Sequence, residues 1–439
     1  MTMCDWQRYN FYVMAKTKRS LAVALDSLGC KLNQAEMQEL ASQLVRAGYR
    51  IVDAPEHADI YILNTCTVTH TADRKSRHLL RLARRRSPAA RLIALGCYAR
   101  RAPQELAGLD GVEISPGNGR ETDLVKLLEN GGRPGQSTPA SLPGRRDVAR
   151  RSRAFIKIQD GCRNFCAYCI VPYVRDDVQS RPAAEIIARA KEKTAAGFRE
   201  AVLTGTEIGE YNDGRTDLAS LIDCVLRETA VTRLRLSSLQ PYHIFPELIK
   251  LWRDTRLCPH FHLSLQSGSD AVLKRMKRRY TAGEYRRAVA LIRASVPDVA
   301  ITTDVIVGLP GETDAEFNAT LEFCREMRFA RVHVFPFSPR PGTAASTMPG
   351  HVSAAVKKER SNQMLVLSGE SSENFRRQFL GRALDVLWEQ SSGGVWSGLT
   401  GNYIRVYARS NDDLTDILLP VKLVKLYRDG IWGDLGQKY

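Results

Sequence analysis

Short apolar runs alternate with helical patterns along most of the chain. In the first third, apolar runs at 21–25, 59–64 and 91–96 have the length of buried strands. A helical pattern lies between the first two runs, from about Asn33 to Ala47, and Gly48 is placed to end it. Its apolar face is formed by Met37, Leu40, Ala41, Leu44 and Val45. This alternation predicts a parallel sheet with helices on both faces.

Six more apolar runs follow, again separated by helical stretches. They occupy residues 155–158, 201–204, 233–237, 261–265, 302–307 and 331–337. Six β/α units predict a partial barrel of the TIM type. An open doubly wound sheet is the alternative, because periodicity alone does not separate the two.

The pattern changes again from about Arg376, where β-rich segments are interrupted by Gly and Asn. This predicts a small antiparallel barrel or sandwich of about 60 residues. The fold class is therefore α/β, with a parallel-sheet domain, a partial (β/α)6 barrel and a small antiparallel β domain. We place these domains at 20–130, 151–372 and 373–439. A Gly-, Pro- and Arg-rich linker is expected at 131–150 and a loose extension at 1–19.

Composition narrows the function classes. The chain has 439 residues and a formal charge of +16, from 64 basic and 48 acidic side chains. That charge favours a polyanionic partner such as nucleic acid, although a merely basic protein is the alternative. No run of about 18 apolar residues and no signal-peptide pattern appears, so we expect a cytoplasmic protein with no membrane partner. Ten cysteines in such a chain indicate metal or redox chemistry rather than disulfides.

The segment "CRNFCAYC" at 162–169 holds three closely spaced cysteines, Cys162, Cys166 and Cys169. Structural zinc sites use four ligands, whereas three thiolates suit an iron–sulfur cluster that leaves one iron open. The segment follows a predicted strand at the mouth of the barrel, where such folds place their chemistry. A zinc knuckle with a remote fourth ligand is the alternative.

Three further cysteines each follow a predicted strand of the first domain: Cys30, Cys66 and Cys97. The carboxyl ends of parallel strands meet at one edge, so we expect these thiols to converge on a second cluster with an open iron. Unrelated loop thiols are the alternative. The remaining cysteines, Cys4, Cys224, Cys258 and Cys324, show no such pattern and are interpreted as core or incidental residues.

The three-cysteine segment is the signature of the radical S-adenosylmethionine (SAM) superfamily, which the chain resembles. From about Ser20 to the C-terminus it is similar to the methylthiotransferase family within it. The resemblance rests on "LGCKLNQAE", "NTCTVT", "GCYAR", "QDGCRNFCAYCIVPY", "HFHLSLQSGSDAVLKRM", "DVIVGLPGET" and "VFPFSPRPGT". It implies an N-terminal methylthiotransferase domain, a radical SAM barrel and a C-terminal RNA-binding TRAM domain. It also implies two 4Fe–4S clusters and SAM as cofactors, with insertion of sulfur into a C–H bond followed by methylation.

The resemblance also implies roles for the two cysteine sets. Cys162, Cys166 and Cys169 would hold the cluster that binds and cleaves SAM, and the N-terminal set would carry sulfur. Tyr168 matches a position that contacts the adenine of SAM, and packing beneath the loop is the alternative. Strand-end positions predict the SAM pocket, with tight turns or caps as the alternative. They are Gly205, Thr206, Glu207, Ser237, Ser238, Gln266 and Ser267.

The segment "NTCTVTHTADRKSR" at 64–77 resembles the MtaB-like branch, which acts on N6-threonylcarbamoyladenosine at position 37 of tRNA. Isopentenyl-adenosine in tRNA and an aspartate of a ribosomal protein are the substrates of the other branches. A non-catalytic, metal-bound RNA-binding protein is the alternative of another class. Two departures from the family pattern are Asp176-Asp177, where Arg-Gly is common, and Gln240, where Glu is common.

Basic residues cluster at 74–86, 144–153 and 274–279. A solvated face explains any one of them, but together they are credible phosphate contacts. We expect Arg84, Arg85 and Arg86 to grip the anticodon stem-loop, and Tyr403, Tyr407 and Tyr427 to offer stacking surfaces. The expected partners are tRNA, a reductant such as flavodoxin or ferredoxin, and a sulfur donor that the sequence does not identify.

Overall fold

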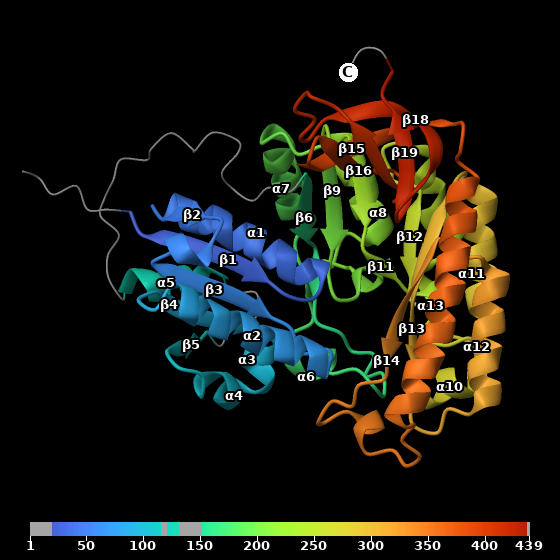
Figure 1. The fold of residues 1–439 in the computed structure, drawn as a ribbon, viewed down its shortest axis with the longest axis horizontal. Helices are drawn as coiled ribbons and strands as arrows, with labels where there is room; N and C mark the ends of the chain where they lie inside the picture. The colour runs from blue at the N-terminus through green and yellow to red at the C-terminus, as the bar shows by residue number, and fades with distance from the viewer. Residues whose placement is uncertain (1–19, 116–120, 131–151, 437–439) are drawn as a thin grey trace, which may run out of the picture.

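The computed structural model describes residues 20–115, 121–130 and 152–436, in which three structural units follow one another (Figure 1). The predicted extension at 1–19 and the predicted linker at 131–150 lie outside the described residues. No helix in the described part of the chain is long and apolar enough to cross a membrane.

The N-terminal unit is a parallel sheet in the order β2-β1-β3-β4-β5. Its strands are β1 (Ala22–Ser27), β2 (Arg50–Val52), β3 (Ile60–Thr65), β4 (Arg91–Gly96) and β5 (Val112–Ile114). Its helices are α1 (Lys31–Arg46), α2 (His70–Arg86), α3 (Cys97–Arg101), α4 (Pro103–Ala107) and α5 (Glu121–Asn130). Ile60 and Ile62 share a core with Leu40 of α1, whereas Tyr61 and Leu63 share one with Leu80 of α2. The alternation along β3 therefore gives the sheet two covered faces.

The predicted elements of this unit are confirmed. All three predicted strands and the helix form, and Gly48 adopts φ +88° after the end of α1, as a terminating glycine does. The edge strands β2 and β5 are not predicted by the sequence pattern. Each is only three residues long and partly exposed, so neither gives a buried apolar run.

The second unit is the predicted partial barrel. Its strands are β6 (Arg153–Lys157), β9 (Glu200–Thr204), β10 (Arg233–Leu236), β11 (Ser238–Leu239), β12 (His260–Leu263), β13 (Ala300–Val307) and β14 (Arg331–Pro336). They are all parallel and lie in chain order, with β10 and β11 separated only by Ser237. The order never reverses, so the doubly wound alternative is wrong. Among the described strands β6 and β14 do not pair, which leaves this barrel open on one side.

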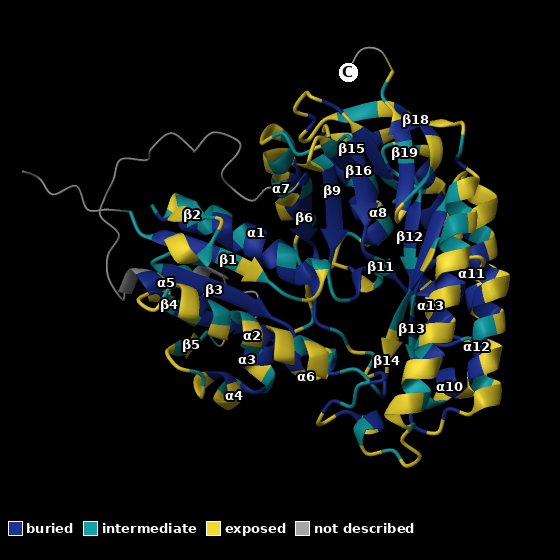
Figure 2. Ribbon diagram, viewed as in Figure 1, coloured by how far each residue is buried: buried dark blue, intermediate teal, exposed yellow. Residues whose placement is uncertain are grey.

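Helices cover the outside of the barrel, with their exposed faces turned to solvent (Figure 2). They are α7 (Ala183–Ala195), α8 (Leu218–Glu228), α11 (Ala282–Ser295), α12 (Asp314–Met327) and α13 (Ala354–Arg377). One apolar core joins these helices to the barrel strands. The predicted domain boundary between 372 and 373 falls inside α13, so the division of the chain remains a prediction.

The C-terminal unit is a closed five-stranded barrel in the order β15-β16-β17-β19-β18. Its strands are β15 (Ala383–Ser392), β16 (Val395–Thr400), β17 (Arg405–Arg409), β18 (Leu418–Tyr427) and β19 (Gly430–Asp434). The predicted antiparallel barrel is confirmed, except that β17 and β19 pair in parallel. The hairpin from β18 into β19 brings β19 beside β17 in the same direction.

This C-terminal barrel covers the amino ends of the central strands. Arg233 donates to the Leu399 carbonyl at 3.0 Å, and Arg235 donates to the Gly401 carbonyl at 2.9 Å. The ring of Tyr403 stacks on His260, with centroids 4.6 Å apart, and the Arg235 guanidinium lies 4.4 Å from its centroid. Tyr403 thus sits between two units, and the expectation that it offers an open surface to RNA is wrong.

Candidate active site

The first cysteine set lies in a loop at the mouth of the central barrel. It follows β6 and the short β7 (Gln159–Asp160), which pairs with β8 (Gln179–Ser180). Backbone hydrogen bonds fix the loop to the barrel. The Ala167 amide donates to the Met276 carbonyl at 2.9 Å, and the Ala345 amide donates to the Ala167 carbonyl at 2.7 Å. Cys162, Cys166 and Cys169 are thereby held on one short turn.

The environment of these thiols fits a metal cluster. Burial raises the pKa of Cys169 to about 12 and also raises the pKa of Cys162, so a bound cation is needed to keep them as thiolates. Donors already point at the sulfurs. Arg278 Nη1 lies 3.2 Å from Cys166 Sγ, and the Asn164 amide lies 3.4 Å from Cys162 Sγ. Hydrogen bonds to sulfur are typical of iron–sulfur sites and tune their potential.

Strand-end residues surround this loop. Gly205 lies against Gln159, whose carbonyl a Cβ at that position would meet at 2.6 Å, and Thr206 Oγ1 donates to Asp160 Oδ1 at 3.3 Å. Glu207 accepts hydrogen bonds from Asn164 Nδ2 at 3.0 Å and Gln240 Nε2 at 3.2 Å. Burial raises the pKa of Glu207 to about 7. Gln240, one of the two departures from the family pattern, therefore donates a hydrogen bond from its amide to a carboxylate of the predicted pocket.

The remaining predicted pocket residues differ in what they can offer a ligand. Ser237 Oγ is buried with no partner among the described residues, and Ser238 is partly exposed. Gln266 adopts φ +68° in the segment that follows β12. Ser267 Oγ lies 3.0 Å from Thr320 Oγ1 of α12, so it is engaged in the barrel wall. Tyr168 packs against the apolar cluster that contains Val272, Met276 and Leu309.

The structure brings the three cysteines of the second set together at the carboxyl edge of the N-terminal sheet. Cys30 follows β1, Cys66 follows β3 and Cys97 follows β4. The sheet order reverses between β1 and β3, which is where open α/β sheets bind ligands. A Cβ on Gly29 would meet Cys66 Sγ at 2.8 Å, so only glycine lets Cys66 approach the Cys30 turn. Burial, together with the neighbouring Cys97 and Cys30 thiols, raises the pKa of Cys66 to about 12.

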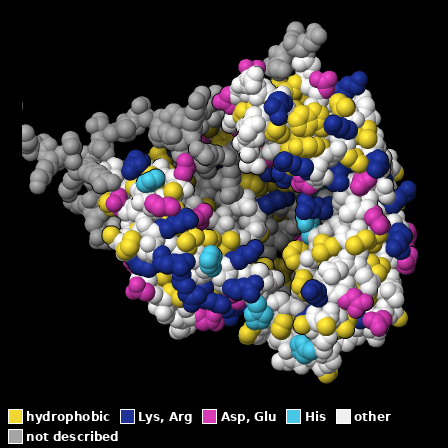
Figure 3. Space-filling model, in the orientation of Figure 1, with side chains coloured by type: hydrophobic (Ala, Val, Ile, Leu, Met, Phe, Trp, Pro, Cys, Tyr) yellow, Lys and Arg dark blue, Asp and Glu magenta, His cyan; other side chains and the backbone are white. Residues whose placement is uncertain are grey.

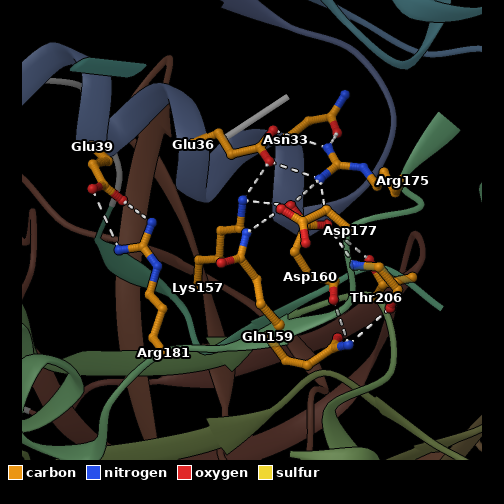
Figure 4. A network of polar contacts seen from close by, with 12 residues as sticks. Asn33, Glu36, Glu39, Lys157, Gln159, Asp160, Arg175, Asp177, Arg181 and Thr206 are labelled. Carbon is orange, nitrogen blue, oxygen red and sulfur yellow. Dashed lines mark hydrogen bonds and ion pairs between the residues drawn. The ribbon is translucent and has the colours of Figure 1, made fainter. Parts of the chain in front are cut away.

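A buried network of charges joins α1 of the N-terminal unit to the barrel (Figure 4). Arg175 donates to Glu36 Oε1 and Asp160 Oδ1, each at 2.8 Å, and its Nε lies 3.3 Å from Cys97 Sγ. Lys157 Nζ lies 2.6 Å from Asp160 Oδ2 and 3.1 Å from Glu36 Oε1. Glu36 comes from α1, whereas the other charged residues come from the barrel unit. The network thus fixes the position of one cysteine set relative to the other.

The sequence does not predict this network, because each member is an ordinary charged residue in the one-dimensional pattern. The Asp176-Asp177 departure lies beside it. Asp176 faces solvent and pairs with Arg100 of α3 at 2.5 Å, and Asp177 Oδ2 accepts a hydrogen bond from Gln179 at 3.1 Å. The extra negative charge is therefore partly neutralised by the N-terminal unit.

Basic side chains gather over α2 on the face shown in Figure 3, which also shows a hollow between the N-terminal unit and the barrel. Arg74, Lys75, Arg81 and Arg85 are exposed, and Arg81 and Arg85 have no hydrogen-bond or ion-pair partner in the described chain. Arg84 differs, because its guanidinium donates to carbonyls of the N-terminal unit.

These carbonyls belong to Pro88, Ala90, Asp110 and Gly111. Arg86 pairs with Glu56 at 3.2 Å. Of the three arginines predicted to bind RNA, Arg85 is thus the one whose guanidinium is unengaged. Arg81, one helical turn before it, shares this property and has no distinguishing signal in the sequence.

The spacing of the cysteine thiols favours iron–sulfur clusters over single metal ions at both sites. The one described group of His, Cys, Asp or Glu whose three ligand atoms lie within 4.8 Å of one another is His262, Asp304 and His333. Neither cysteine set is that compact, whereas four thiolates around one zinc ion would be. A partial barrel with an open three-thiolate loop at its mouth defines a radical SAM enzyme, here with a second three-thiolate site beside it.

Comparison with known proteins agrees with this class. Residues 156–324 match the model described as "Radical SAM superfamily", and residues 22–115 match "Uncharacterized protein family UPF0004". Threonylcarbamoyladenosine tRNA methylthiotransferase MtaB of Bacillus subtilis (strain 168) is 35% identical over 92% of this chain and 94% of its own. The chain belongs to the radical SAM methylthiotransferase family, in its MtaB-like branch. It is a SAM-dependent enzyme, and the cofactors of its family are SAM and two 4Fe–4S clusters.

Two further comparisons involve a relative from another branch of the family and a solved structure. The tRNA-2-methylthio-N(6)-dimethylallyladenosine synthase of Thermodesulfovibrio yellowstonii is 31% identical over 94% of this chain and 98% of its own. The radical SAM methyltransferase TsrM of Kitasatospora setae superposes with a TM-score of 0.57, at 17% identity, over 74% of this chain and 75% of its own. At that identity the second likeness shows the fold alone.

Proposed function

We propose that this protein adds a methylthio group to C2 of N6-threonylcarbamoyladenosine at position 37 of tRNA. The observation that carries the proposal is the pair of three-cysteine sites, which the Arg175 network joins. One site alone would suit many radical SAM reactions. Sulfur insertion needs both a radical source and a sulfur carrier, and two open-iron sites supply these two functions.

Each site has a distinct role in this proposal. Cys162, Cys166 and Cys169 would hold the cluster that binds SAM, and Cys30, Cys66 and Cys97 would hold the cluster that carries sulfur. When bound, the first cluster and SAM supply the radical that removes hydrogen from C2. Tyr168 and the strand-end residues would line the SAM pocket, where Glu207 and Asn164 offer a carboxylate and an amide beside the cluster loop.

The domain plan follows from these roles. Residues 20–130 would form the methylthiotransferase domain and 151–372 the radical SAM domain, joined by the linker 131–150. Residues 373–439 would form the TRAM domain. The exposed basic face of α2 supports docking of the anticodon stem-loop next to Cys66. A cytoplasmic location, a reductant such as flavodoxin or ferredoxin and a separate sulfur donor complete the proposal.

Nucleoside mass spectrometry of tRNA from cells with and without the gene tests the substrate. We expect the deletion strain to lose the methylthio derivative of threonylcarbamoyladenosine and to accumulate the unmodified parent. Loss of a methylthio isopentenyl-adenosine, or of a ribosomal-protein modification, would assign the chain to another branch. If purified protein lacks the charge-transfer absorption of an iron–sulfur cluster, the non-catalytic RNA-binding alternative is favoured.

A further inference from the structure

The inside of the central barrel is unusually polar on one side. His260 and His262 of β12, Thr302 and Asp304 of β13, and His333 of β14 lie at alternate positions of their strands. Barrels of this type normally fill their interior with branched apolar side chains. Here His262 Nε2 lies 3.2 Å from Asp304 Oδ2, and His262 Nδ1 lies 3.0 Å from Thr302 Oγ1. His262, Asp304 and His333 are partly exposed, so a ligand can reach them.

A lysine from the N-terminal unit reaches the same region. Lys31 begins α1, directly after Cys30, and its Nζ lies 5.7 Å from the ring centroid of Tyr403. Tyr403 in turn stacks on His260. Burial would raise the pKa of Asp304, but the hydrogen bond from His262 and nearby charges, including that of Lys31, lower it. The Tyr403 ring therefore contacts both Lys31 and His260, which places Lys31 near the polar side of the barrel.

Among the described residues, Lys31 is the cation of this region that lacks a carboxylate partner, although it lies over the Tyr403 ring. Its Nζ makes no hydrogen bond or ion pair with any described residue. The neighbouring arginines each have a carboxylate partner: Arg233 and Arg235 share Glu200, and Arg153 pairs with Glu389. The imidazole of His333 likewise makes no hydrogen bond within the described chain, and its ring lies against that of His262. A half-buried ammonium without a carboxylate partner and an imidazole without a hydrogen-bond partner favour a ligand that carries an anionic acceptor.

A metal ion is the other ligand that His262, Asp304 and His333 suit by type and spacing. The charge balance opposes it. The group already contains the negative charge of Asp304, which pairs with His262, and the positive charge of Lys31 acts on the same histidines. A divalent cation would add to that charge, whereas a carboxylate would offset it.

We propose that Lys31, with His333 and the His262–Asp304 pair, binds the carboxylate-bearing N6 substituent of the target adenosine. This inference rests on the proposed function and names the residues that choose the substrate. A threonylcarbamoyl group carries a carboxylate, a hydroxyl and a urea, whereas a dimethylallyl group offers no polar atom. Because Lys31 adjoins Cys30, a substituent held by its ammonium would keep the base beside the proposed sulfur-carrying site.

The test uses the reconstituted enzyme and two synthetic anticodon stem-loops. One contains N6-threonylcarbamoyladenosine and the other its methyl ester, which removes only the negative charge. We expect kcat/KM of the wild type to be about 10- to 100-fold higher for the acid, the range of one charge-assisted hydrogen bond. Lys31→Met should bring this ratio near one, and Lys31→Arg should restore most of it. Lys191→Met, on the exposed face of α7, is the matched control and should keep the full ratio.

Each outcome decides the inference. Equal kcat/KM for acid and ester in the wild type overturns it, and this comparison needs no variant. An unchanged ratio in Lys31→Met also overturns it, as does a stoichiometric divalent ion that His333→Phe releases. If Lys31→Met loses iron, the acid-to-ester ratio of His333→Phe replaces it, and the same loss of preference is expected. Product from neither stem-loop refutes the proposed function itself, whereas equal product from both refutes only the role of Lys31.

Discussion

Replacing Arg175 by Met removes the centre of the buried network that joins the two cysteine sites. The Arg175 side chain is 2% exposed, and its two terminal nitrogens donate to Asn33, Glu36 and Asp160 at 2.8 to 3.0 Å. The variant would leave Glu36 and Asp160 buried with Lys157 as their one remaining cationic partner in the network. Breaking a buried ion pair in this way costs about 3–5 kcal/mol, because the remaining charge is uncompensated.

The expected consequence has a stability part and a cluster part. We expect Arg175→Met to lower the free energy of unfolding by about 3–5 kcal/mol, measured by urea denaturation of the reconstituted protein. We also expect it to lose iron from the N-terminal site first, because Arg175 Nε no longer donates to Cys97 Sγ. Asp176→Asn is the matched control. Its pair with Arg100 is exposed, so a loss of at most about 1 kcal/mol is expected.

A compensated variant separates the charge argument from simple loss of packing. Adding Glu36→Gln to Arg175→Met removes one of the stranded charges and should recover part of the lost stability. The reasoning is refuted if Arg175→Met unfolds within about 0.5 kcal/mol of the wild type. It is also refuted if the double variant is less stable than the single variant, since stranded charge would then not be the cause.

Three further predictions concern the pocket and the basic helix α2. Burial raises the pKa of Glu207 to about 7, so ionisation of this carboxyl opposes folding. The free energy of unfolding should therefore fall as the pH rises from the ordinary carboxyl range to about 7. Urea titrations at several pH values should show that Glu207→Gln flattens this slope, and an unchanged slope would contradict the prediction. Arg81→Glu with Arg85→Glu should weaken tRNA binding and reduce its salt dependence by roughly one log–log unit per lost phosphate contact, as measured by filter binding; unchanged binding would place the RNA elsewhere. Arg84→Glu should instead lower stability, because Arg84 binds carbonyls of its own unit.

The sequence predicts the central architecture well because buried parallel strands give strong signals. The run at 91–96 coincides with β4, and all six predicted barrel strands form within two residues of their expected ends. The exceptions are strands that lack such a signal. Arg50–Val52 and Val112–Ile114 are short edges, and the parallel pairing of β17 with β19 depends on closure of the barrel rather than on any local pattern.

Some parts of the sites can be predicted from the sequence and others cannot. The cysteine sets can be predicted because thiols at strand ends are chemically specific and the topology brings them together. The network around Arg175 and the group around Lys31 cannot be predicted from the sequence, because each depends on contact between units that are distant in the chain. Lys157 and Glu36 are 121 residues apart, and their burial exists only in the assembled structure. In sequence, His262 belongs to the apolar run at 261–265 and His260 precedes it, and only the fold shows that both line the interior of the barrel.

The central claim is that the two cysteine sets have separate functions, and paired triple variants test it most directly. Each variant is reconstituted anaerobically, and iron, 5′-deoxyadenosine and methylthio product are measured side by side. The first variant replaces Cys30, Cys66 and Cys97 by Ala. It should keep about half the iron and retain SAM cleavage, because the N-terminal site belongs to a separate sheet, and it should form no methylthio product. The second variant replaces Cys162, Cys166 and Cys169 by Ala. It should lose both SAM cleavage and product formation and keep the other half of the iron. Product from the first variant, or loss of its deoxyadenosine, would contradict the account.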